Sequence, residues 1–133
     1  RKPRKMKQAF DLALEQTERS LSNIDWNSYG SVLFISKSIG TVISSAYAPT
    51  RSDCKSILFT PLAETFSFPL AGSIAFHGTA DPWAETDSIR ELAAQKDVPL
   101  FLTQNANHSL ETGDVLTDIF ILKTTMERVQ RFI

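Results

Sequence analysis

The sequence has little sulfur chemistry, because Cys54 is its single cysteine. One cysteine cannot form an internal disulfide, and this excludes the small secreted domains that depend on disulfides for their stability. A lone thiol fits a reducing compartment, and an inert packing or surface role is the simplest interpretation of Cys54. We expect neither a metal site nor a cofactor.

The chain also lacks long apolar runs. None approaches the ~20 residues that a membrane-spanning helix requires, and no stretch resembles a signal peptide. A length of 133 residues, with 42% hydrophobic and 22% charged residues, is typical of one globular domain. We therefore expect a cytoplasmic protein that makes no contact with a membrane.

The net charge of −1 hides an uneven distribution. Five basic residues lie among the first seven, so the remainder has 9 basic and 15 acidic side chains, a balance of −6. Such a cluster can mark a nucleic-acid module, and a salt-dependent shift with DNA or RNA would support that alternative. Since the acidic body would repel phosphate, we interpret the cluster as the solvated start of a helix and expect no nucleic-acid partner.

The spacing of apolar residues predicts helices that alternate with strands. An apolar stripe from Met6 to Ile24 predicts a helix of about five turns, and helical spacing returns between Ile39 and Tyr47, where Ala48-Pro49 should end the helix. Short apolar runs between the helices predict buried strands at Val32–Ile35, Ile57–Phe59, Ser73–Phe76 and Leu100–Leu102.

Two more helices complete the pattern. Ser88 to Glu91 resembles a capping box that would open a helix, and an amphipathic helix runs from Leu116 to Ile133. Strands that alternate with helices and lack polar alternation predict a parallel sheet with helices on both faces. The fold class expected is therefore α/β, a three-layer sandwich with a mostly parallel sheet.

Polar residues that could take part in catalysis follow three of these strands. Ser38 follows the first, Asp81 the third and His108 the fourth, where the carboxyl ends of parallel strands place active sites. Singly, these residues are commonly a helix cap, a turn residue and a surface histidine. Together, in the order Ser, Asp, His, with the serine at a sharp strand-to-helix turn, they resemble the α/β-hydrolase family.

The resemblance covers nearly the whole chain and matches the carboxy-terminal part of that fold. The four predicted strands correspond to the fifth to eighth strands of the family. We therefore expect residues 1–133 to form a single domain that lacks the amino-terminal strands and comes from a longer protein. The family's turn carries small residues two positions on either side of the nucleophile. Gly40 supplies one, and Ser36 stands where glycine is usual.

The resemblance implies a role for each residue. Ser38 would be the nucleophile, His108 its general base, and Asp81 the residue that orients the histidine. Ile39 would donate its backbone N–H to the oxyanion. The implied activity is hydrolysis of a small or accessible ester, thioester or amide through an acyl-enzyme, because the twelve residues from Pro61 to Gly72 are too few for a cap domain.

Other candidates are weaker. Phe66, Phe68 and Trp83 are positioned in the sequence to line a substrate pocket, although core packing explains them about as well. We interpret His77 as structural and Lys37 as a solvated residue or one at the substrate rim.

Two expectations concern the part of the fold that this chain lacks. The family's second oxyanion donor comes from an upstream loop, so we expect slow turnover, and a catalytically silent binding or scaffold protein is the alternative. The strand Val32–Ile35 would present an unpaired edge. We therefore expect a homodimer or a separate chain that carries the missing strands.

Overall fold

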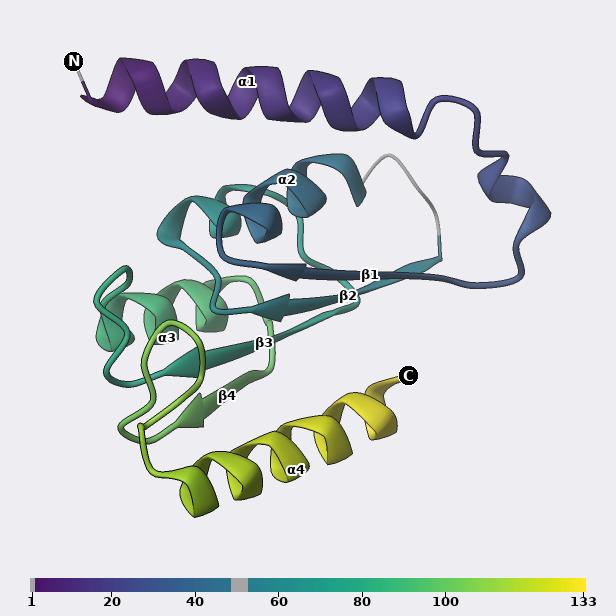
Figure 1. Ribbon diagram of the computed structural model, residues 1–133. Coiled ribbons are helices and arrows are strands. Elements are labelled where there is room, and N and C mark those ends of the chain that lie inside the picture. Colours follow the sequence, from purple (N-terminus) through teal and green to yellow (C-terminus); the bar gives the residue numbers. More distant parts are fainter. Residues whose placement is uncertain (1, 49–52) are drawn as a thin grey trace.

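The computed structural model describes residues 2–48 and 53–133 of the chain. Its four strands form one parallel sheet with neighbours in sequence order (Figure 1). They are β1 (Val32–Lys37), β2 (Cys54–Phe59), β3 (Ser73–Gly78) and β4 (Leu100–Thr103). The predicted parallel sheet is confirmed, and each strand extends one to three residues beyond an end of its apolar run.

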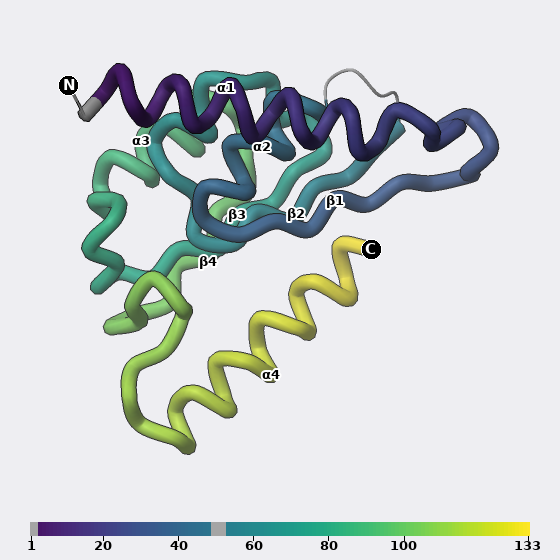
Figure 2. Tube along the Cα trace, turned by 45° about the horizontal axis from the view of Figure 1, so that its top comes forward, coloured from purple at the N-terminus to yellow at the C-terminus, as the bar shows by residue number. Residues whose placement is uncertain are grey.

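Helices cover both faces of this sheet. They are α1 (Lys2–Ser20), α2 (Ile39–Tyr47), α3 (Thr86–Gln95) and α4 (Val115–Phe132), with short 3-10 turns η1 (Trp26–Ser28) and η3 (Ala63–Ser67). Figure 1 shows α1 and α2 on one side of the sheet and α4 on the other. In Figure 2, α1 runs along the outer side of α2, and Figure 1 shows the sheet between these two helices and α4. The three-layer α/β fold is thus confirmed.

The side chains of the central strands alternate between two cores. Leu58 and Ala75 pack with Ile89 and Ala93 of α3, whereas Ile57 and Ile74 face the opposite layer. A strand residue buried on either face needs an apolar side chain, which is why β2 and β3 read as continuous apolar runs. The second core also contains Phe76, Val129 and the partly buried Phe101 and Phe132.

The edge strand β1 is covered less than predicted. Phe34 faces α2 and contacts Trp26 and Tyr47, but Ile35 on the other face is 61% exposed. The prediction that this strand is buried on both faces is therefore wrong at Ile35. The buried Val129 of α4 packs against side chains of β2 and β3. The helix therefore leaves Ile35 of β1 uncovered.

Two predicted helix boundaries also need correction. The first helix ends at Ser20, and the apolar stripe continues through a turn in which the Ile24 N–H donates to the Leu21 carbonyl at 3.2 Å. The third helix begins at Thr86 rather than at Ser88, so the predicted capping box lies inside its first turn. Residue 1, which belongs to the basic cluster, and Pro49, predicted to end the second helix, lie outside the described residues. None of the described helices is both long enough and apolar enough to cross a membrane.

Candidate active site

Ser38 occupies a strained turn between β1 and α2. Its φ of 54° and ψ of −126° are rare for a residue with a side chain, and such conformations cost on the order of 1–3 kcal/mol. Backbone bonds hold it there: the Ser38 N–H donates to Phe59 O at 3.0 Å, and the Ser38 carbonyl accepts from Thr41 N–H at 2.9 Å. The strain therefore persists because the neighbouring strand β2 and the helix α2 both bond to the turn.

The neighbours of the turn explain how a serine is accommodated at position 36, where the resemblance led us to expect glycine. A Cβ placed on Gly40 would lie 3.8 Å from the Ser36 Cβ, so the two positions face each other at ordinary contact distance. The Ser36 hydroxyl lies 2.8 Å from the Ser44 hydroxyl of α2. Ser36 is thus accommodated as a hydrogen-bonded link between strand and helix.

The three residues predicted to react lie together. His108 Nε2 is 2.7 Å from Ser38 Oγ, and His108 Nδ1 is 2.8 Å from Asp81 Oδ2. The Asp81 side chain is fully buried, and that of His108 is 18% exposed. A hydroxyl, an imidazole and a buried carboxylate joined in this order are the components needed to activate a serine for acyl transfer.

Similar arrangements of helices and strands occur in solved structures. A candidate hydrolase of the alpha/beta superfamily from Xanthomonas campestris aligns over 91% of this chain and 69% of its own, with 13% identity and a TM-score of 0.55. A candidate alpha/beta hydrolase from Agrobacterium tumefaciens aligns over 90% and 56%, with 18% identity and a TM-score of 0.62. This chain has the α/β-hydrolase fold.

A third similar structure is the apo form of esterase 2 from Thermogutta terrifontis, which aligns over 74% of this chain and 55% of its own, with 20% identity and a TM-score of 0.54. The chain thus spans between about half and two thirds of these α/β-hydrolase structures. No family model and no curated protein matches the sequence.

Within this α/β-hydrolase fold, Gly78 brings the loop of the aspartate against the loop of the histidine. A Cβ on Gly78 would lie 2.3 Å from the Ala106 carbonyl oxygen, a distance that real side chains do not reach. The same carbonyl accepts the Ala80 N–H at 2.9 Å. Sequence reasoning missed Gly78, although a glycine at the end of a strand can indicate close approach of another backbone.

Asn107 shapes the loop that carries the histidine. Its side-chain oxygen accepts the backbone N–H groups of Ser109 at 2.8 Å and Glu111 at 3.2 Å. An asparagine whose side chain accepts from backbone groups further along the chain fixes a turn. Asn107 therefore sets the direction in which the His108 side chain points. Asn107 was also missed, because only its turn propensity was visible in the sequence.

His77 is buried beneath the same loops. Its Nε2 lies 2.9 Å from the Thr86 hydroxyl, while its buried Nδ1 has no hydrogen-bond partner. Burial lowers the pKa of His77, the Asp81 carboxylate offsets part of this effect, and His108 lowers the pKa further. We therefore interpret His77 as a neutral, structural residue, because a proton on its Nδ1 would find no acceptor.

The weaker substrate-binding candidates separate in the structure. Phe66 is 3% exposed and belongs to the core cluster of Leu58, so it does not face the serine. Phe68 is half-buried, stacks on Phe10 with ring centroids 6.2 Å apart, and lines a groove that also includes Ile39. Trp83 is 70% exposed, and its ring centroid lies 5.4 Å from that of His108.

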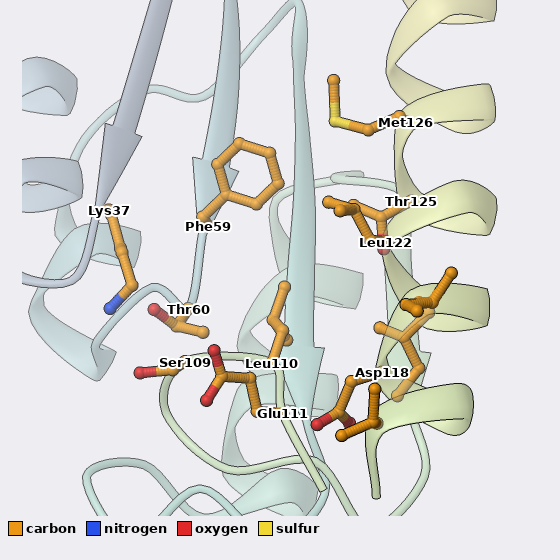
Figure 3. Close-up of a pocket in the computed structure, with 13 residues that line it drawn as sticks. Lys37, Phe59, Thr60, Ser109, Leu110, Glu111, Asp118, Leu122, Thr125 and Met126 are labelled. Carbon is orange, nitrogen blue, oxygen red and sulfur yellow. The ribbon is translucent and has the colours of Figure 1, made fainter. Parts of the chain in front are cut away.

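A second groove of about 590 Å³ lies between the sheet and α4. Figure 3 shows Lys37, Ser109 and Glu111 around one end of it, with Phe59 and Met126 toward the other. Lys37 is exposed and lines this groove beside Ser109, the residue after His108. Within residues 2–48 and 53–133, no group of three or more histidine, cysteine and carboxylate side chains could hold a metal ion.

Proposed function

We propose that this chain carries the nucleophile, base and acid of a serine hydrolase. The observation that supports this function is the continuous contact from Ser38 Oγ through both nitrogens of His108 to Asp81 Oδ2. Fold alone would not justify the assignment, since α/β scaffolds host many activities. The proposal therefore rests on the side-chain geometry.

In the first half-reaction, His108 Nε2 removes the Ser38 proton while Oγ forms a bond to the carbonyl carbon of the substrate. The carbonyl π electrons move to oxygen, and the oxyanion accepts the N–H of Ile39 at the start of α2, where the helix dipole is favourable. The tetrahedral species then expels the leaving group, which takes the proton from His108. An acyl-serine and a free alcohol, thiol or amine result.

In the second half-reaction, a water molecule replaces the leaving group. His108 removes one water proton as the water oxygen bonds to the acyl carbon, and the collapse of this intermediate returns the proton to Ser38 Oγ. Asp81 keeps Nδ1 protonated and stabilises the imidazolium in both steps. The products are a carboxylic acid and the regenerated serine.

A short, accessible acyl group is the substrate that fits best. Only residues 60–72 connect β2 to β3, and the sole helical element there is the 3-10 turn η3. Thermogutta terrifontis esterase 2 has been solved with propionate bound and phosphonylated by cyclosarin. These ligands support a test with short esters and with an organophosphonate probe.

The test is covalent labelling with a fluorophosphonate, followed by mass spectrometry of the modified peptide. We expect one adduct, on Ser38, and no adduct in Ser38→Ala. Ser20→Ala, at the exposed end of α1, is the matched control and should label like the wild type. Full labelling or full esterase activity in Ser38→Ala would reject the assignment.

A further inference from the structure

Trp83 contacts both the acid and the base of the candidate triad. Its backbone N–H donates to Asp81 Oδ1 at 2.8 Å, the oxygen that does not face His108. Its indole lies beside the imidazole, with ring centroids 5.4 Å apart and planes inclined by 30°. One residue therefore holds the carboxylate through its backbone and covers the imidazole through its side chain.

The contact matters because the imidazole must keep two bonds at once. Rotation of the His108 ring would break its contacts with Ser38 and Asp81, and a flat aromatic surface along the ring opposes that rotation. Since Trp83 is 70% exposed, its ring is held outside the two core clusters and retains a largely solvated surface. The indole is thus placed where it adds little to the core and contacts the imidazole.

The indole also provides a suitable surface for positive charge. In both half-reactions the imidazole becomes an imidazolium, and a cation within about 6 Å of an indole is attracted to its π electrons. The stabilisation typical of such pairs corresponds to a roughly 3- to 30-fold rate effect when it occurs only in the transition state.

We propose that Trp83 is a positioning residue that holds His108 in line with Ser38 and stabilises its imidazolium form. This inference rests on the proposed hydrolase function. It differs from the sequence expectation for Trp83, which was a wall of the substrate pocket. Asp81 contacts this histidine directly, the buried His77 interacts with it electrostatically, and substitution of the indole removes neither group.

Steady-state kinetics with short esters separate positioning from substrate contact. We expect Trp83→Ala to lower kcat roughly 3- to 30-fold with little change in KM, equally for small and bulky leaving groups. Trp83→Phe should recover most of the rate because it retains an aromatic face. Tyr29→Ala, which removes another exposed aromatic ring, should match the wild type. A raised KM with unchanged kcat would make Trp83 a substrate wall and overturn the proposal, as would an unchanged rate.

The pH dependence of kcat/KM should shift in a direction that a purely structural role of Trp83 would not produce. Because catalysis requires neutral His108, loss of an indole that favours the imidazolium should move the acid limb of kcat/KM to lower pH in Trp83→Ala. If the indole only shielded the ring from water, its removal would move the limb to higher pH. A shift to higher pH, or none, contradicts the proposal.

Fluorescence tests the ring pair without catalysis. In a Trp26→Phe background, Trp83 is the single tryptophan, and protonation of a stacked imidazole should quench its emission as the pH falls. His108→Gln should remove this quench. A quench without fluorophosphonate labelling would reject the hydrolase and keep the ring pair, whereas labelling without a quench would reject the role of Trp83.

Discussion

His108 Nδ1 and Asp81 Oδ2 lie 2.8 Å apart, although the two residues are 27 positions apart in the chain. The Asp81 side chain is fully buried, and its other oxygen accepts the Trp83 N–H. A buried carboxylate with both oxygens engaged has a fixed direction. In the proposed mechanism, it selects the imidazole tautomer that leaves Nε2 free to accept the Ser38 proton.

Asp81→Asn should keep this geometry and lose the tautomer. An amide can donate to Nδ1 and so favour a proton on Nε2, where it blocks removal of the serine proton. We expect kcat for a short ester to fall on the order of 10⁴-fold, the scale seen when a triad aspartate is replaced in this way. Asp87→Asn, at an exposed position in α3, is the control. A loss of less than about tenfold in Asp81→Asn would show that this carboxylate does not orient the base.

Gly78→Ala should separate the two loops of the site. The added methyl carbon would lie 2.3 Å from the Ala106 carbonyl oxygen, so the backbone before His108 must move. We expect a loss of about 1–3 kcal/mol in the free energy of unfolding by urea and a marked fall in the rate of fluorophosphonate labelling. Gly30→Ala has nothing within 4 Å of the added carbon and should change neither. Wild-type labelling in Gly78→Ala would mean that the close approach does not set the position of the base.

His77 should make the fold sensitive to acid. Because its pKa is lowered in the folded state, the unfolded chain binds a proton first as the pH drops through the ordinary histidine range near 6.5. This group therefore removes stability below that pH, by at most about 1.4 kcal/mol per pH unit.

His77→Gln tests this linkage. An amide can still contact the Thr86 hydroxyl but takes up no proton, so the free energy of unfolding should fall less between pH 7 and pH 5 than in the wild type. The comparison is made by urea denaturation at both pH values, and the two proteins have the same carboxylates and the same His108. An identical fall in the two proteins would exclude His77 as the acid-sensitive group.

The sequence was sufficient to predict the sheet and the meeting of the three residues, for a simple reason. Apolar runs without polar alternation indicate parallel strands, and the carboxyl ends of parallel strands share one edge. Ser38, Asp81 and His108 follow three such ends, so their approach depends on topology more than on loop detail. The helix Ile39–Tyr47 was likewise predicted with its observed bounds.

Features that depend on side-chain packing were not predictable in this way. Phe66 and Trp83 are both aromatic residues in connecting segments, yet one is buried in the core and the other stacks on His108. Whether each ring is buried depends on the path of its loop, which the local pattern of residues does not encode. The exposure of Ile35 was missed because the pattern of a strand does not reveal whether a neighbour covers it.

The described part of the chain leaves large apolar side chains exposed on both β1 and α4. β1 is the last strand of the sheet there, and Ile35 is 61% exposed. Across the groove shown in Figure 3, several large side chains of α4 are also exposed. They are Val115, Leu116, Ile119, Phe120, Leu122 and Met126. Several exposed apolar side chains of this size are typical of a surface that another segment covers.

We therefore propose that β1 pairs with a strand of a second copy, because an open apolar edge offers unpaired N–H and C=O groups. Gel filtration with light scattering should give a mass above the 14.8 kDa of one chain. Ile35→Lys places a charge on this edge and should shift the equilibrium toward monomer, whereas Leu12→Lys, on the exposed side of α1, should not. A monomer at every concentration, with the amides near Val32 protected from exchange, would contradict the proposal.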